Sequence, residues 1–165
     1  MAALTVAVWD EAGLHASHVQ AKGTTDGVLH AAYTICQGDL CERKSLHVPA
    51  ASLSGAPSLR LTHRMLTQPV ALAAVGGMIL LTTCCLVVSE ETNRLLDLVG
   101  GREWGWFILF AALAAHAFEG FIAFIQCLRV GFGFAAAVQW GVLTSVTGFP
   151  ILRWVLKLPT PKQQP

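Results

Sequence analysis

Charge is scarce in this sequence. Only 13% of the 165 side chains are charged, whereas a soluble domain has roughly 25%. The formal net charge is +1, so the chain offers no basic field for the phosphates of a nucleic acid, and we expect no nucleic-acid partner. With 54% apolar residues and a mean hydropathy of +0.56, the composition predicts an integral membrane protein whose main partner is the lipid bilayer.

The sequence also lacks a cysteine framework and a glycosylation acceptor. Its five cysteines include no C-x-x-C pair, and the only asparagine, Asn93, is not followed by the required Ser or Thr. We expect free thiols, no resident metal and no cofactor. One alternative stays open: a loose string of His30, Cys36, Cys41 and His47 that wraps Zn²⁺, although its spacing matches none of the common zinc fingers.

What the sequence does contain is long stretches without charge. They cover residues 65–89, 104–118 and 130–152. A helix needs about 20 apolar residues to cross the hydrocarbon core, because every backbone amide must be satisfied within the segment. The first and third stretches meet this length, and the second does so if its helix continues past Glu119 to Leu128. We therefore predict an all-α membrane protein with three transmembrane helices. The predicted spans cover about residues 69–89, 104–128 and 133–152.

Two segments outside the predicted spans can also be interpreted. Residues 1–64 show no sustained period of two or 3.6, so we expect a disordered N-terminal tail, followed by a transmembrane domain over residues 65–165. After the first span, Ser89 precedes two glutamates as a helix N-cap would, and Gly100 provides a stop. This pattern predicts a short helix lying on the membrane interface.

Two ionisable residues stand within the second predicted span. His116 and Glu119 are three residues apart and therefore share one helical face. A charged residue near the centre of a membrane helix costs roughly 2.5–3.5 kcal/mol on insertion scales, so Glu119 should be paired, protonated or turned toward a polar interior. Pairing with His116 is the economical arrangement. Small residues continue the same face at Gly120 and Ala123, which predicts close packing against another helix.

The third predicted span supplies a matching surface. Gly133, Ala137 and Gly141 repeat at intervals of four, a small-xxx-small pattern that lets helix backbones approach each other. Thr144 and Gly148 extend this surface. The candidate buried polar site is therefore His116 and Glu119 with the Thr144 hydroxyl.

This C-terminal pattern resembles the transmembrane protein 254 family over roughly residues 66–157. In that family, one helix carries a His-x-x-Glu pair with a downstream alanine and cysteine, and the next carries a tryptophan, a threonine and a glycine at intervals of four. The matching positions here are His116, Glu119, Ala123, Cys127, Trp140, Thr144 and Gly148. Leu143 stands where the family tends to have glutamine. The resemblance implies a multi-pass membrane protein with a shared buried site, and it brings no reaction with it.

Two functional hypotheses follow. The first is a non-enzymatic accessory protein that packs through its small-residue faces with a second copy or with other membrane helices. The alternative is a site for a lipid or sterol-like ligand, with His116 and Glu119 as an acid/base pair. A metal centre is weaker because the other two spans carry no carboxylate. The sequence does not identify an organelle, so the endoplasmic reticulum or another internal membrane is the default location.

Overall fold

The computed structural model describes residues 1–37, 40–50 and 53–159. The described residues form seven helices and one three-stranded antiparallel sheet, so the expected all-α fold is wrong. The helices are α1 (Ala2–Ala12), α2 (Leu59–Leu66), α3 (Pro69–Leu86), α4 (Glu90–Asp97), α5 (Arg102–Arg129), α6 (Phe134–Thr147) and α7 (Phe149–Val155). The strands are β1 (Ala16–Thr25), β2 (Val28–Gln37) and β3 (Leu40–Pro49).

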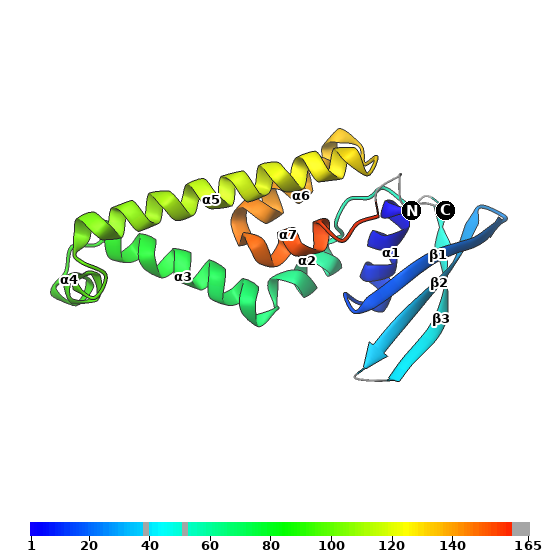
Figure 1. Ribbon diagram of the computed structural model, residues 1–165, viewed down its shortest axis with the longest axis horizontal. Coiled ribbons are helices and arrows are strands. Elements are labelled where there is room, and N and C mark those ends of the chain that lie inside the picture. Colours follow the sequence, from blue (N-terminus) through cyan, green and yellow to red (C-terminus); the bar gives the residue numbers. More distant parts are fainter. Residues whose placement is uncertain (38–39, 51–52, 160–165) are drawn as a thin grey trace.

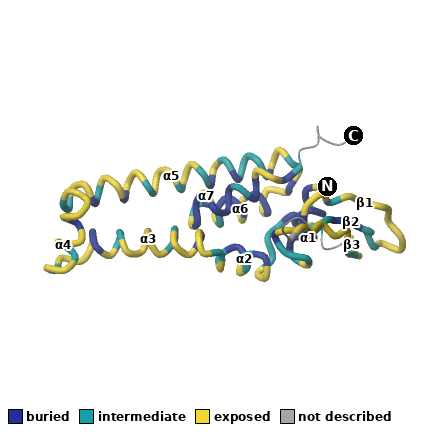
Figure 2. The backbone as a smooth tube through the Cα atoms, turned by 60° about the horizontal axis from the view of Figure 1, so that its bottom comes forward, coloured by how far each residue is buried: buried dark blue, intermediate teal, exposed yellow. Residues whose placement is uncertain are grey.

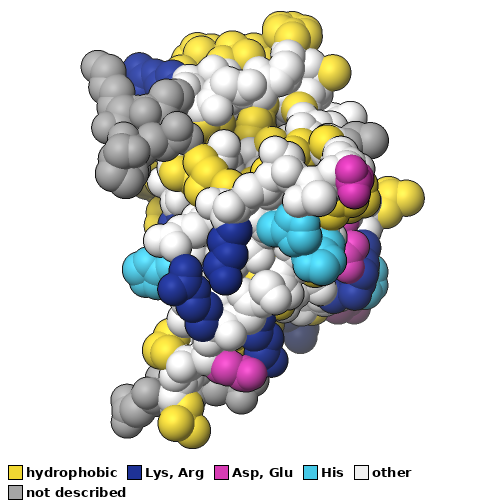
Figure 3. All heavy atoms as spheres, turned by 90° about the vertical axis from the view of Figure 1, so that its right-hand side faces the viewer, with side chains coloured by type: hydrophobic (Ala, Val, Ile, Leu, Met, Phe, Trp, Pro, Cys, Tyr) yellow, Lys and Arg dark blue, Asp and Glu magenta, His cyan; other side chains and the backbone are white. Residues whose placement is uncertain are grey.

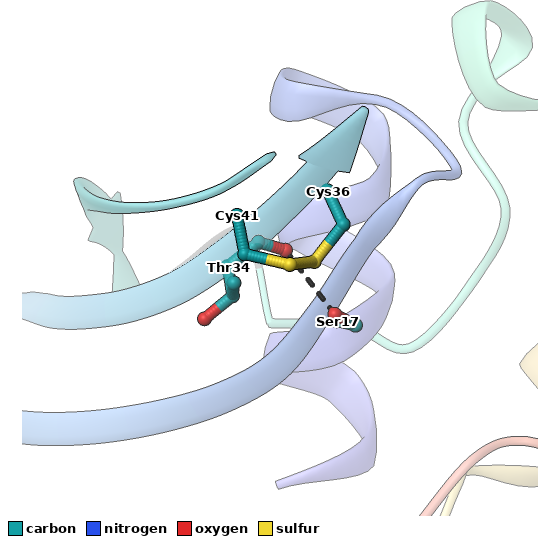
Figure 4. The surroundings of a disulfide bond; sticks show 4 residues. All are labelled: Ser17, Thr34, Cys36 and Cys41. Carbon is teal, nitrogen blue, oxygen red and sulfur yellow. Dashed lines mark hydrogen bonds between the residues drawn. A yellow bond between two sulfur atoms is a disulfide. The ribbon is translucent and has the colours of Figure 1, made fainter. Parts of the chain in front are cut away.

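The N-terminal segment is folded, which corrects the expectation of a disordered tail. Strand β1 turns into β2 through Asp26 and Gly27, and both have positive φ, the backbone conformation that a two-residue hairpin requires. Cys36 and Cys41 form a disulfide between β2 and β3. Figure 4 shows this bond beside Ser17, whose hydroxyl donates to the Thr34 carbonyl at 3.3 Å. These two cysteines are therefore not free thiols, whereas Cys84, Cys85 and Cys127 are free and buried.

Two helices of the described chain are long and apolar enough to cross a membrane, α3 and α5. At 1.5 Å per residue, the 18 residues of α3 extend about 27 Å and the 28 residues of α5 about 42 Å. Pro69 occupies the first turn of α3, where a missing amide hydrogen costs no hydrogen bond. Between the two helices, α4 begins with a capping box formed by Ser89 and Thr92.

The third predicted span is wrong, because the chain reverses within it. Helix α6 has 14 residues, about 21 Å, and ends at Gly148, whose φ of +72° is the left-handed conformation that favours glycine. Pro150 then stands in the first turn of α7, which has only seven residues. An uncharged stretch long enough to span is thus divided into two short helices, neither of which reaches the length a span requires.

The helices form a wedge. Figure 1 shows the end of α3 and the start of α5 close together beside α4. The two helices separate toward the end of the molecule that carries α1 and the sheet, where α6 and α7 lie between them. A small cluster that includes Cys85, Leu96 and Leu109 holds the closed end. The larger core, at the open end, combines residues of α1, the sheet, α2, α5, α6 and α7. Its contacts include the rings of Trp9 and Trp154, whose centroids are 5.7 Å apart.

The apolar residues of α3 and α5 face outward. Only 17% of the most apolar window of each helix is buried, although a core helix of a soluble protein would be mostly buried. Figure 2 shows exposed residues along nearly the whole length of both helices. The sheet end differs in character, since Figure 3 shows basic, acidic and histidine side chains gathered there. The molecule therefore has an apolar helical part and a polar end.

Candidate functional site

Helices α5 and α6 cross at two glycines. A Cβ on Gly120 would lie 2.7 Å from the carbonyl oxygen of Gly141, and a Cβ on Gly141 would lie 3.2 Å from the carbonyl oxygen of Gly120. Ala123 and Ala137 are fully buried one turn further along. Gly133 lies apart from this contact, because it is the exposed N-cap of α6 and a Cβ there would meet nothing within 4 Å. The small residues of α5 and α6 thus pack against each other within one chain.

His116 and Glu119 lie near the middle of α5 and face the reversal between α6 and α7. The Nε2 atom of His116 and the Oε2 atom of Glu119 each lie 2.9 Å from the position that a Cβ on Gly148 would occupy. Gly148 is buried. Both ionisable side chains therefore converge on the one residue at which the chain turns back, and only glycine leaves room for them there.

The hydrogen bonds of this cluster are incomplete. The Nδ1 atom of His116 lies 3.2 Å from the carbonyl oxygen of Ser145, and since a carbonyl only accepts, Nδ1 carries the proton and donates it. Among the described residues, no hydrogen bond or ion pair joins His116 to Glu119. Glu119 Oε2 and Thr144 Oγ1 are buried and have no hydrogen-bond partner in the described chain. The cluster can therefore still accept a hydrogen bond and donate one.

The other positions of the family pattern are buried. Cys127 and Trp140 are fully buried, like Ala123 and Thr144. The indole Nε1 of Trp140 donates to the carbonyl of Gly55 at 2.8 Å, which ties the segment before α2 to α6. The sequence does not identify the carbonyls of Gly55 and Ser145 as hydrogen-bond acceptors, because every residue has a backbone carbonyl.

The site does not have the composition of a metal centre. Within the described ranges, no group of three or more His, Cys, Asp and Glu side chains is arranged to hold a metal ion. The alternative zinc string also lacks its sulfur ligands, because Cys36 and Cys41 are joined to each other. His30 and His47 face each other across β2 and β3, with ring centroids 4.5 Å apart. What α5 and α6 can offer is hydrogen bonding and proton transfer.

Two long helices with outward-facing apolar side chains and a polar cluster between packed helices define a membrane protein. The family model of transmembrane protein 254 matches residues 69–157, more than half of the chain, and the chain belongs to this family. The resemblance of the C-terminal pattern is thereby confirmed. No curated protein and no solved structure matches the chain.

Proposed function

We propose that this protein is a non-enzymatic accessory protein that crosses the bilayer twice, through α3 and α5, and inserts α6 and α7 as a re-entrant hairpin. The contact of Gly148 with His116 and Glu119 supports this placement, because it sets the tip of the hairpin near the middle of α5. Irregular backbone is tolerated at this depth only where protein covers it, and Gly148 is buried. Both ends of the chain then lie on one side of the membrane, with α4 on the other.

The observation that carries an accessory role is the exposed small-residue face in the middle of α3. Between Ala71 and Cys84, none of its residues is buried. On this stretch Gly76 and Gly77 are exposed, and a Cβ on either would meet nothing within 4 Å. Small residues on a membrane helix let another helix approach closely. A surface of small residues can also pack against an identical surface, so we assign α3 of a second copy of the protein as the helix that covers it.

In this proposal, His116 and Glu119 hold the hairpin in place. The bond from His116 to the Ser145 carbonyl joins the middle of α5 to the last turn of α6. An average interhelical hydrogen bond in a membrane is worth about 0.6 kcal/mol, so its role is to fix the register of the helices more than to add stability. Neutral replacements that cannot keep this arrangement should release the hairpin.

A second candidate function rests on the two unsatisfied groups. The hydroxyl of a sterol-like ligand could donate to Glu119 Oε2 and accept from Thr144 Oγ1, and a transferred proton could be taken up by Glu119 Oε2 alone. Such a site would use His116 and Glu119 as an acid/base pair. The two proposals differ in what the pair is needed for, which is holding the hairpin in place in the first and binding or proton transfer in the second.

The self-association is tested on the full chain reconstituted in lipid bilayers. Gly77→Leu fills the small face of α3, and Ala114→Leu provides a matched enlargement at an exposed position of α5. Single-molecule photobleaching should count two copies for the wild type and for Ala114→Leu, and one copy for Gly77→Leu. A monomeric wild type, or a Gly77→Leu protein that still forms pairs, would refute the assigned occupant.

The role of the polar pair is tested with the double variant His116→Asn, Glu119→Gln. If the pair holds the hairpin, the variant loses membrane abundance and protease resistance of the segment around α6 and α7. If the pair serves a ligand, the variant persists at wild-type levels and loses only photolabelling by a sterol probe. Unchanged abundance together with unchanged photolabelling would contradict both proposals.

A further inference from the structure

A cavity of about 450 Å³ opens where the N-terminal segment meets the end of α7. Its walls come from α1, from the segment between α1 and β1, from the start of β1 and from the end of α7 with the residues after it; they include Trp9, His15, His18, Trp154 and Lys157. The register of β1 against β2 shifts between Ser17 and Gln20. A bulge of this kind breaks the strict alternation of strand side chains, which explains how consecutive residues of β1 reach one cavity.

The ionisable side chains of this cavity favour negative charge. Lys157 supplies an ammonium group, whose Nζ lies 4.4 Å from the centroid of the Trp154 ring. His15 and His18 add two imidazoles, and the described lining contains no carboxylate. A cavity with a cation, two imidazoles and no acidic group is suited to an anion.

The position of the cavity indicates where such an anion would come from. Arg153, next to Trp154, donates from Nη2 to the side-chain oxygen of Gln68 at 2.8 Å. Gln68 is the N-cap of α3, so the end of α7 lies level with the residue at which the first span begins. Trp9 and Trp154 pack edge to face at this level within the core.

We propose that this cavity binds the phosphate group of an anionic membrane lipid. Lys157 would neutralise the phosphate, while the exposed apolar side chains of the neighbouring helices would contact the acyl chains. This assignment rests on the membrane placement proposed above, which sets the cavity at the depth of the lipid head groups. It is independent of the His116 and Glu119 cluster and of pairing through α3.

The test is native mass spectrometry of the full chain released from mixed micelles of phosphatidylcholine and phosphatidic acid. The wild type should retain phosphatidic acid in preference to phosphatidylcholine. Lys157→Gln should weaken this retention about fivefold, because a basic residue near an anionic lipid surface is worth about 1 kcal/mol. The matched control Lys22→Gln removes the same charge from an exposed position of β1 outside the cavity, and it should leave retention unchanged.

Three results would overturn the proposal. Equal retention of the two lipids would remove the phosphate specificity, and equal losses in Lys157→Gln and Lys22→Gln would reduce the effect to net charge. Displacement of the lipid by water-soluble glycerol phosphate at equal concentration would assign the site to a soluble ligand. Carbonate extraction of the membranes from which the chain is purified separates this failure from that of the membrane placement, because a misplaced chain would leave the membrane whether or not it binds the lipid.

Discussion

Replacing Gly120 by alanine tests the crossing of α5 and α6 directly. The added methyl group would overlap the Ser145 hydroxyl and would lie 2.7 Å from the carbonyl oxygen of Gly141, whereas an ordinary contact is at least 3.4 Å. The serine side chain can rotate away, but the carbonyl belongs to the backbone of α6. The two helices must therefore move apart by several tenths of an ångström, and overpacking of this kind costs about 1–3 kcal/mol.

The matched variant is Gly76→Ala on α3, where the methyl group would meet nothing within 4 Å. Both substitutions gain the same helix propensity of about 1 kcal/mol, so this gain cancels when the two variants are compared. The free energy of unfolding should then be about 1–3 kcal/mol lower for Gly120→Ala than for Gly76→Ala. Titration of the full chain with SDS in mixed micelles, followed by circular dichroism, measures this difference under dilute, monomeric conditions.

A second substitution sharpens the interpretation. Adding Ser145→Ala to Gly120→Ala removes the side-chain overlap and leaves the close approach to the Gly141 carbonyl. This double variant should recover only part of the lost stability. Equal stability of Gly120→Ala and Gly76→Ala would refute the reasoning, because the crossing would then have room for a Cβ.

Three other predictions follow. Trp140→Phe removes the buried indole donor to the Gly55 carbonyl, which should cost about 1–3 kcal/mol of unfolding free energy and make the segment before α2 more sensitive to protease. Serine in place of both cysteines of the hairpin disulfide should cost about 2 kcal/mol, since the bond closes a short loop; alkylation of the wild type should reveal two additional thiols only after reduction. The pKa of the Glu91 carboxyl is lowered by hydrogen bonds from its own backbone amide and from Ser89. Its stabilisation of the start of α4 is therefore complete at neutral pH and is lost as the pH falls through this lowered pKa, and amide exchange in α4 should show this pH dependence in the wild type and not in Glu91→Gln.

The apolar helices could be predicted from the spacing of charges, and the reversal could not. Stretches with little charge identify α3 and α5 because a span of about 20 residues carries few charges. The stretch before Arg153 passes the same count, although Gly148 and Pro150 divide it. Whether a glycine ends a helix or lies within it depends on what it packs against, and here His116 and Glu119 occupy the space that a side chain would need.

The prediction of a disordered N-terminal segment is wrong for a different reason. The Asp26-Gly27 pair is a strong local signal for a hairpin and was available in the sequence. The lack of a sustained period of two or 3.6 argues against a core, but this segment does not build its core alone. Its apolar residues share one cluster with Ile151, Trp154 and Val155 from the other end of the chain. Such a shared core has no periodicity within either segment.

The contact between Trp9 and Trp154 has a consequence for the order of folding. Synthesis delivers the N-terminal segment first, yet part of the cover of α1 is α7, which is made after both long helices. The apolar side chains of α1 that contact α7 therefore stay uncovered until α7 has been made and has packed against them.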